Sequence, residues 1–370
     1  MTAALVVGGG TGGHVNPAIA IAEALVASGW GDVALVGTPR GLEAEAVPAA
    51  GHPLLTIDLA PFPRRGQRRS GLWRARLRAV GKLVAGIVSA WRLVGRERPR
   101  VAVSVGGYAS VPVVLAARLR RVPLIAVSYD AIPGLANRLT IRLAAATAVA
   151  FPDPTLRRAV HTGAPIRREL ATLDLDAERA AARRRLGLPA DRFTVLVVGG
   201  SQGSGAINAV VRDFATAYAG RTDLAIRHVV GRRNAEGWAP RLDLSGLVHQ
   251  VVPFEYDMAS AYAAADVVLA RAGASTVAEI GALGLASVLV PWPAAAEDHQ
   301  TANARWLADV GGAVLIPEAE LDVDRLGAVL DDLRDPARRA EVRAASASRG
   351  RRDAAGAVAR LAVEHARAPW

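Results

Sequence analysis

A glycine-rich stretch near the N-terminus contains the first residues able to do chemistry. Residues 5–17 read LVVGGGTGGHVNP, an apolar run followed by a glycine turn with one titratable side chain, His14. Glycine has no Cβ, so a polar ligand can approach the backbone closely, and the free N–H groups of the helix expected over residues 17–27 favour an anion. His14 could take a proton from a bound hydroxyl, because an unperturbed imidazole has a pKa of about 6.5. A capping or packing role explains His14 equally well.

The same pattern returns about 190 residues later. An apolar run at residues 193–198 leads into GGSQGSG at 199–205, and a helix is expected over 206–218. Ser201 and the neighbouring N–H groups would form a phosphate cradle. The first turn lacks the G-x-G-x-x-G spacing and the later acidic residue of a dinucleotide site, so that interpretation is weak. Two such units predict two similar domains that face one cleft.

A third candidate follows the strand expected at residues 266–270. Ser275 and Thr276 would cap the next helix, and Glu279 would lie one turn further in. If it faces a ligand, the Glu279 carboxylate could accept both hydroxyls of a ribose. The alternative is a capping box in which Glu279 pairs with Ser275 or Thr276, since the spacing fits.

Strands and helices alternate along both halves, which predicts parallel sheets with helices on both faces. Expected strands lie at residues 33–36, 54–59, 101–105, 122–127 and 288–290. Between residues 151 and 190 the alternation gives way to short proline-containing segments and a charged helical stretch, and we place the domain boundary there. The expected domains are residues 1–163 and 164–345, followed by a C-terminal helix within 346–370 that packs back on the first domain. Arg167 lies just beyond the break and could face a cleft.

Composition narrows the classes of protein. A chain of 370 residues is long enough for two domains, and 51% apolar with 21% charged residues excludes a disordered chain. Without cysteine there is no disulfide framework and no cysteine zinc site. No histidine ligand pair and no metal-binding signature is present, so neither a metal nor a cofactor is expected. The chain shows no signal peptide and no apolar run long enough to span a membrane, which predicts a cytoplasmic protein.

Positive charge is concentrated in one segment. Between Arg64 and Arg100 there are twelve Lys and Arg residues and a single acid, Glu97, within a net charge of +11 for the chain. Apolar residues recur at spacings of three and four over residues 72–94, which predicts an amphipathic helix. With Trp among the apolar residues, the basic helix at 72–96 suits an anionic membrane surface. A core helix with a solvated basic face is the alternative, and nucleic acid fits less well because base-reading motifs are absent.

Six motifs follow one another along the chain: GGGTGGH at 8–14, GGYASVP at 106–112, GLAN at 134–137, GGSQG at 199–203, RAGASTVAE at 271–279 and HQTANA at 299–304. Together and in this order, they resemble the MurG family of peptidoglycan synthesis. The resemblance implies the GT-B fold, an α/β architecture of two Rossmann-like doubly wound domains facing a cleft. It also implies an inverting transfer of N-acetylglucosamine from UDP-GlcNAc to undecaprenyl-pyrophosphoryl-MurNAc-pentapeptide (lipid I), by a peripheral enzyme on the cytoplasmic face of the plasma membrane.

The resemblance implies a role for each matched residue. The first domain would take the lipid acceptor, with His14 as the base on its hydroxyl, and the second would take the sugar nucleotide. Arg167 and Ser201 would hold the diphosphate, Glu279 the ribose, and Gln300 the GlcNAc hydroxyls. Further expected substrate contacts are Thr11, Gly12 and Gly13 near the donor sugar or phosphates, Ala274, Ser275, Thr276, Val277 and Ala278 around the nucleoside, and Tyr108, Asp130, Gln202 and Asn303.

One loop departs from the family pattern. Residues 128–131 are Ser-Tyr-Asp-Ala, where the family usually has His-Glu, then Gln or Ala, then Asn. Asp130 could supply a carboxylate in place of the glutamate, but Ala131 cannot replace an amide. Ala164 also stands where an Asn often precedes Pro165. Two other functions therefore stay open: a related transferase with another lipid or a natural-product acceptor, and a non-catalytic sugar-nucleotide sensor or membrane scaffold.

Overall fold

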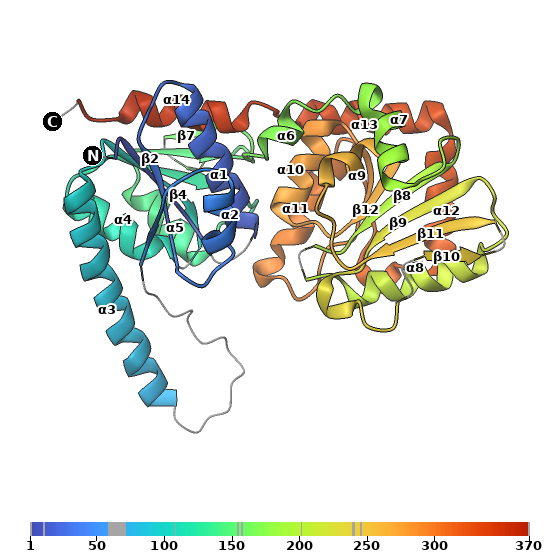
Figure 1. Cartoon of the computed structure of the whole chain (residues 1–370), viewed down its shortest axis with the longest axis horizontal. Helices are drawn as coiled ribbons and strands as arrows, with labels where there is room; N and C mark the ends of the chain where they lie inside the picture. The colour runs from blue at the N-terminus through green and yellow to red at the C-terminus, as the bar shows by residue number, and fades with distance from the viewer. Residues whose placement is uncertain are drawn as a thin grey trace. The chain divides into compact units, whose positions relative to one another are not determined.

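Apolar strands covered by amphipathic helices form two units, each with its own core (Figure 1). The computed structural model describes residues 2–368 except 10–11, 58–71, 108, 154, 157, 201, 239–240 and 245, and it leaves out the side chains of 72–83 and 241–244. Unit 1 comprises Met1–Tyr129, Pro133–Arg168 and Asp353–Trp370. Unit 2 comprises Asp130–Ile132 and Glu169–Arg352.

The sheet of unit 1 is parallel throughout, in the order β3-β2-β1-β4-β5-β6-β7. Its central strands are buried on both faces and consist almost entirely of Val, Leu, Ile and Ala, as expected for parallel strands covered by helices. The strands are β1 (Ala4–Gly8), β2 (Val33–Gly37), β3 (Leu54–Thr56), β4 (Val101–Gly106), β5 (Leu124–Ser128), β6 (Ala146–Val149) and β7 (Ala159–His161).

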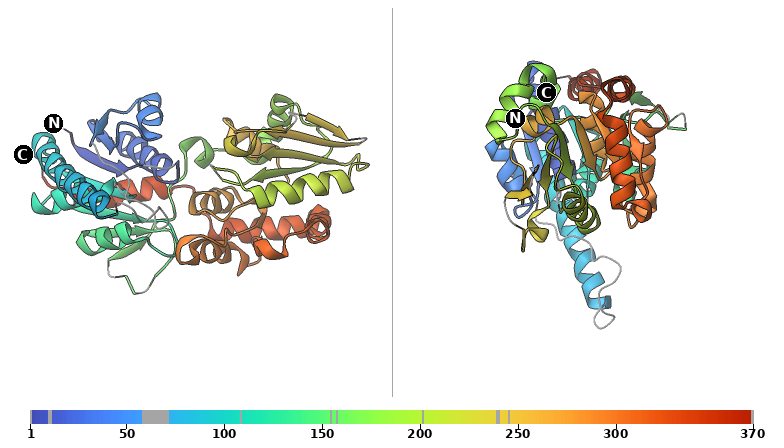
Figure 2. Two further views of the ribbon diagram at one scale, coloured as in Figure 1. Left: turned by 90° about the horizontal axis from the view of Figure 1, so that it is seen from below. Right: turned by 90° about the vertical axis from the view of Figure 1, so that its right-hand side faces the viewer.

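Helices cover both faces of this sheet (Figures 1 and 2). The C-terminal helix α14 packs against α1 and against β4, β5 and β6, and α3 packs against α4. From α3, the buried residues Ala90, Leu93 and Val94 join the core formed by the strands. The helices are α1 (Gly12–Ala27), α2 (Glu43–Ala49), α3 (Leu72–Glu97), α4 (Ser110–Leu119), α5 (Leu135–Leu143) and α14 (Ala354–His365).

The sheet of unit 2 has the order β10-β11-β9-β8-β12-β13-β14. All pairs are parallel except β10 with β11, which form an antiparallel pair at the edge. The strands are β8 (Phe193–Val198), β9 (Leu224–Val229), β10 (Arg241–Leu244), β11 (Leu247–Val252), β12 (Val267–Ala270), β13 (Ala286–Leu289) and β14 (Val314–Leu315).

Helices also lie on both faces of this second sheet (Figure 2). Helix α7 packs against α9, α12 against α8, and α10 against α13. The helices are α6 (Arg168–Ala171), α7 (Leu175–Leu186), α8 (Gly205–Ala217), α9 (Met258–Ala264), α10 (Ala274–Leu283), α11 (His299–Ala308), α12 (Val323–Arg334) and α13 (Pro336–Arg349), with short 3₁₀ turns η1 (Arg232–Asn234), η2 (Ala296–Asp298) and η3 (Glu318–Glu320).

Both units have the strand order of a doubly wound Rossmann sheet, so the predicted pair of Rossmann-like domains is confirmed. In such sheets ligands bind beyond the carboxyl ends of the strands, where the order reverses. This point lies between β1 and β4 in unit 1 and between β8 and β12 in unit 2. The glycine turns at residues 8–14 and 199–205 leave the sheets at these two points.

Two expectations about elements need correction. Helix α1 begins at Gly12 and contains Pro17, whereas the sequence was interpreted as helical only from Pro17. Proline has no N–H, so the carbonyl of Gly13, four residues earlier, lacks its usual helical hydrogen bond from residue 17. The antiparallel strand β10 was also not expected. Within the described residues, no helix combines the length and apolar character needed to cross a bilayer.

Candidate active site

The imidazole of His14 lies at the carboxyl edge of the unit 1 sheet, in the first turn of α1 and not in the preceding turn as expected. An ideal Cβ placed on Gly106 would lie 3.5 Å from His14 Cδ2 and 3.6 Å from Nε2. Tyr129 approaches the ring edge-on, with centroids 5.9 Å and planes 66° apart. The imidazole is therefore held between the residues that end β4 and those that follow β5.

Two consecutive glycines allow this packing. Gly106 and Gly107 have φ values of +99° and +86°, a backbone conformation that glycine adopts without strain. A Cβ on Gly107 would lie 2.7 Å from the carbonyl oxygen of Gly9 and 3.6 Å from the His14 ring. A side chain at Gly107 would therefore push the end of β4 away from the turn that leads to His14, whereas at Gly106 it is the positive φ that requires glycine.

Asn137 adds a polar group that sequence analysis did not select, although it ends the GLAN motif. Its Nδ2 donates a hydrogen bond to the carbonyl of Val127 at 3.2 Å. Its Oδ1 is buried and has no hydrogen-bond partner among the described residues. Its Cγ lies 4.0 Å from the same Cβ position on Gly106 that adjoins His14 Nε2. Because a buried acceptor without a donor is costly, this oxygen is suited to a ligand hydroxyl.

The second glycine turn is held closed by its neighbours in unit 2. A Cβ on Gly231 would lie 2.6 Å from Gly203 Cα, so the two backbones touch at a point where only glycine fits. Asn234 Nδ2 bridges the Gln202 and Val230 carbonyls at 3.2 Å each. The Gln202 side chain itself is exposed. These contacts hold Gln202 and Gly203 near the amino end of α8, where backbone N–H groups favour an anion.

Arg271 connects the loops behind this turn, and sequence analysis gave it no role of its own. Its Nη2 donates to Ser204 Oγ at 2.7 Å, and Ser204 caps α8 by accepting from Ile207 N. Its Nη1 donates to the carbonyls of Val290 and Pro291 at 3.2 and 3.0 Å. It also forms an ion pair with Glu318. Arg271 is only 8% exposed, so these bonds are shielded from water. They hold together the loops at the carboxyl edge of the sheet.

Glu279 lies buried in the second turn of α10. Its Oε2 accepts a hydrogen bond from Tyr262 Oη at 2.8 Å. Helix α10 begins at Ala274 with Gly273 as N-cap, and no side chain caps it. The predicted capping by Ser275 and Thr276 is therefore wrong: both lie inside the helix, where they are half-buried.

An arginine and two aromatic residues lie close to the carboxyl ends of β9 and β11. Phe254 and Tyr256 are 37% and 78% exposed, with ring centroids 4.8 Å apart. The Arg232 guanidinium lies 4.7 Å from the Phe254 ring centroid and donates to Tyr256 Oη at 2.8 Å. Exposed aromatic faces with a cation can stack a flat base. No sequence motif marks them, because they lie in an irregular loop.

A buried pair of histidines lies under α8. His228 Nε2 is 3.0 Å from Asn208 Oδ1, and His228 Nδ1 is 3.2 Å from His249 Nε2. Asn208 Nδ2 donates to the Val230 carbonyl, so Oδ1 must accept from His228. Burial lowers the pKa of His228 to about 3 and that of His249 to about 4, and the neighbouring His249 and Arg212 contribute to the shift of His228. Both rings are therefore neutral near pH 7.

Other predicted site residues are placed as follows. Gly12 and Gly13 open α1, and Arg167 is half-buried at the end of unit 1. Gln300 lies in the first turn of α11, where its Oε1 accepts from Trp292 N at 3.0 Å. Val277 is buried, whereas Ala278 is half-buried. Thr11, Tyr108 and Ser201 lie outside the described residues. Among the described residues, no cluster of three His, Cys, Asp or Glu side chains is arranged to hold a metal ion.

Comparison with known proteins places this geometry in a family. Residues 4–149 match the glycosyltransferase family 28 N-terminal domain, and residues 194–358 match the family 28 C-terminal domain. Two relatives, from Nocardioides sp. and Clavibacter sepedonicus, are both named UDP-N-acetylglucosamine–N-acetylmuramyl-(pentapeptide) pyrophosphoryl-undecaprenol N-acetylglucosamine transferase. They are 40% and 42% identical to this chain, over 97% and 98% of its length and 97% and 96% of their own.

This chain belongs to the MurG family. The crystal structure of Acinetobacter baumannii MurG superposes with a TM-score of 0.73 at 29% identity, covering 98% of this chain and 100% of that one. A kitacinnamycin glycosyltransferase shares the fold at 19% identity, with a TM-score of 0.69. The MurG resemblance that the six motifs indicated is thereby confirmed, and with it the GT-B class of fold.

The loop that departs from the MurG pattern is tied to the HQTANA motif. Asn303 is fully buried, and its Oδ1 accepts from Ala131 N at 2.8 Å. Its Nδ2 donates to Asp130 Oδ1 at 3.1 Å and to the Ala272 carbonyl at 3.2 Å. Asp130 and Ala131 thereby belong to unit 2, although their neighbours along the chain belong to unit 1. Both ends of the Asn303 amide are used within the protein.

Proposed function

We propose that this chain transfers N-acetylglucosamine from UDP-GlcNAc to undecaprenyl-pyrophosphoryl-MurNAc-pentapeptide, giving lipid II. The observation that carries this proposal is the near-complete match, at 40–42% identity, to enzymes named for that reaction. The packed imidazole of His14 and the polar carboxyl edge of unit 2 provide groups suited to it.

In the proposed reaction the acceptor oxygen attacks the anomeric carbon of GlcNAc while the bond from that carbon to the phosphate oxygen breaks. His14 takes the hydroxyl proton, and UDP leaves with the electron pair of the broken bond, so the configuration inverts. The N–H groups at the amino ends of α8 and α10, with Arg167 and Ser201, would stabilise the diphosphate. Glu279 would hold the ribose, Gln300 the sugar, and Phe254 the uracil ring.

The base role of His14 is tested by His14→Ala, with His52→Ala in the same unit as control. General base catalysis contributes roughly 10²- to 10⁴-fold, so kcat for His14→Ala should fall by about that factor while the Kd for UDP stays within twofold. His52→Ala should match the wild type. Steady-state transfer to a lipid I analogue and calorimetry with UDP provide the two measurements. An equal loss of turnover and UDP binding would contradict the base role.

A second candidate is the same transfer to a different acceptor. It is favoured by the loop at residues 128–131, which lacks the histidine, glutamate and asparagine usual in the family and is held by Asn303 through Asp130 and Ala131. A transfer assay pairing UDP-GlcNAc with lipid I analogues and with soluble acceptors distinguishes the two. Transfer only to a soluble or unrelated lipid acceptor would replace the first proposal. UDP binding without any transfer would favour a sensor or scaffold.

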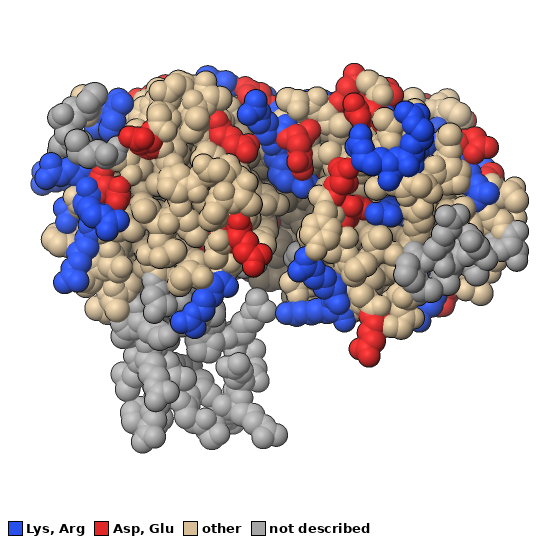
Figure 3. Space-filling view, in the orientation of Figure 1, with Lys and Arg blue, Asp and Glu red and all other residues tan. Residues whose placement is uncertain are grey.

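We also propose that unit 1 docks on an anionic membrane through α3, which would place the enzyme peripherally on the cytoplasmic face. Exposed apolar side chains on the described half of α3 are Val84, Val88 and Trp91, at 55%, 42% and 45%. Arg92 and Arg96 are exposed on the same turns of the helix, and basic side chains lie on this side of unit 1 (Figure 3). The side chains of residues 72–83 lie outside the description, so this proposal rests on the later turns of α3.

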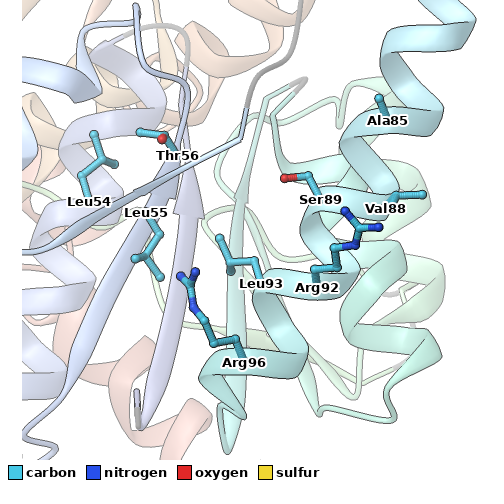
Figure 4. Close-up of a pocket in the computed structure, with 9 residues that line it drawn as sticks. All are labelled: Leu54, Leu55, Thr56, Ala85, Val88, Ser89, Arg92, Leu93 and Arg96. Carbon is cyan, nitrogen blue, oxygen red and sulfur yellow. The ribbon is translucent and has the colours of Figure 1, made fainter.

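A groove between α3 and the edge strand β3 supports this proposal (Figure 4). Its volume is about 880 Å³, and its walls combine Leu54, Leu55 and Val88 with the guanidinium groups of Arg92 and Arg96. Arg96 already pairs with Glu97 at 2.9 Å. Apolar walls with a further exposed cation from Arg92 match an anionic lipid, whose headgroup and acyl chain need both.

Vesicle co-sedimentation tests the docking proposal. The double substitution Val88→Ser and Arg92→Glu should weaken binding to anionic vesicles at least tenfold, because it removes an apolar contact and reverses a charge worth about 1 kcal/mol near an anionic surface. Arg325→Glu, an exposed arginine on α12, is the matched control and should bind as the wild type does. Wild-type binding should decrease with added salt. Equal binding to neutral and anionic vesicles at all salt concentrations would exclude charge-driven docking.

A further inference from the structure

A buried carboxylate lies beside the glycine turn that leads to His14. Glu43 is the first residue of α2, and its exposed fraction is 0%. Its Oε1 accepts from Thr38 N at 2.9 Å and from Thr38 Oγ1 at 2.7 Å. A glutamate is rarely buried completely, because removing its charge from water is costly. Glu45, two residues further along the same helix, is exposed as expected.

Three glycines from three segments leave room for this side chain. A Cβ on Gly9, in the turn between β1 and α1, would lie 2.7 Å from Glu43 Oε1. A Cβ on Gly37, at the end of β2, would lie 2.5 Å from Glu43 Cγ, and one on Gly41 would overlap the carboxylate. None of the three has a positive φ. The glycines are therefore explained by the space that Glu43 occupies and not by backbone conformation.

We propose that Glu43 is a positioning residue for His14. Its carboxylate holds the Thr38 backbone and packs against Gly9, and so fixes the glycine turn against the end of β2. The turn in turn fixes the start of α1, since a Cβ on Gly8 would lie only 2.8 Å from the His14 carbonyl oxygen. This inference rests on the proposed function, because it needs His14 to act on an acceptor. Displacing a reacting group by about 1 Å can cost roughly 100-fold in rate.

The first test compares Glu43→Ala with Glu45→Ala, a matched change on the same helix. For Glu43→Ala, kcat should fall 10- to 100-fold, while the KM for UDP-GlcNAc and the Kd for UDP stay within threefold. A conservative Glu43→Gln, which keeps the volume and an acceptor oxygen for Thr38, should recover kcat to within about fivefold of the wild type. Glu45→Ala should be indistinguishable from the wild type. Glu43→Gln no better than Glu43→Ala would overturn the proposal.

Gly41→Ala provides a second test in which neither Glu43 nor a residue of the glycine turn is substituted. Its new Cβ displaces the carboxylate, so kcat should fall as it does for Glu43→Ala. In the double variant Gly41→Ala/Glu43→Ala the carboxylate that the new Cβ would displace is absent. The loss of kcat should therefore equal that of Glu43→Ala alone and not the sum of the two single losses. Additive losses would overturn the proposal even if Glu43→Ala lowers stability. If the wild type transfers no sugar, the proposed function is wrong. If the wild type transfers sugar and Glu43→Ala is equally active, only this inference is wrong.

Discussion

At the scale of single residues, the buried pair Glu279 and Tyr262 yields the sharpest expectation for donor binding. The Glu279 carboxylate accepts from Tyr262 Oη at 2.8 Å, and both side chains are at most 9% exposed. Tyr262→Phe removes this donor without changing the packing of the ring. A lost hydrogen bond to a buried charged group costs roughly 1.5–3 kcal/mol, so the carboxylate should be held less firmly. We expect the Kd for UDP to rise 3- to 10-fold, with kcat nearly unchanged.

Calorimetric titration with UDP measures this effect, and Tyr218→Phe is the control. Tyr218 lies in the same unit, stacked on Phe214 with ring centroids 4.3 Å apart. Its substitution should leave the Kd for UDP unchanged. Identical affinities of the Tyr262→Phe and wild-type proteins would show that Glu279 does not hold the ribose.

Residue type and local spacing selected His14 and Glu279 as candidates, but not the buried polar residues close to the same sheet edges. A glycine turn next to a single histidine is visible in a linear sequence. Arg271, Asn137 and Glu43 are not, because one arginine, asparagine or glutamate on a helix or loop resembles an exposed residue until its burial is known. Arg271 is marked by its bonds to the distant residues Ser204 and Glu318. Glu43 and Asn137 are marked by how closely they approach glycines of other segments, Gly9 and Gly106. Local spacing also misassigned Ser275 and Thr276 as caps, since Gly273 takes the N-cap position.

At the scale of elements, hydrophobic periodicity predicted most of the parallel strands and the amphipathic helix α3. Buried parallel strands are apolar throughout, so runs such as those of β1 and β8 are visible without an alignment. The start of α1 was missed because proline usually marks the first turn of a helix, whereas here Pro17 follows five helical residues. The edge strand β10 was missed because its sequence, RLDL, is short and mixed in polarity.

At the scale of the whole chain, the two units share one strand order, and this makes the two glycine turns more informative together than either turn is alone. Each glycine turn alone fits many ligands, but both leave their sheets where the strand order reverses. Relatives that align over nearly the entire chain, at 40% and 42% identity, show the family, which no single turn could establish.

The two units should differ in their stability to acid. His228 and His249, both in unit 2, have pKa values lowered to about 3 and about 4, chiefly by burial. In the unfolded chain a histidine has a pKa of about 6.5, so between these values the unfolded state binds more protons than the folded state. The stability of unit 2 is therefore complete above pH 6.5 and is lost as the pH falls towards 4. The loss can reach about 1.4 kcal/mol per pH unit for each histidine.

Calorimetric unfolding at pH 7.5, 6.0 and 5.0 should show a transition that moves to lower temperature as the pH falls. His249→Gln keeps a donor for His228 Nδ1 but removes one titrating group, so this variant should lose roughly half of the pH dependence between pH 6.5 and 5. His365→Gln, in α14 of unit 1, is the control and should leave the pH dependence as it is in the wild type. If the wild type and His249→Gln move by the same amount, the acid sensitivity does not come from the buried pair, and other groups must bind the protons.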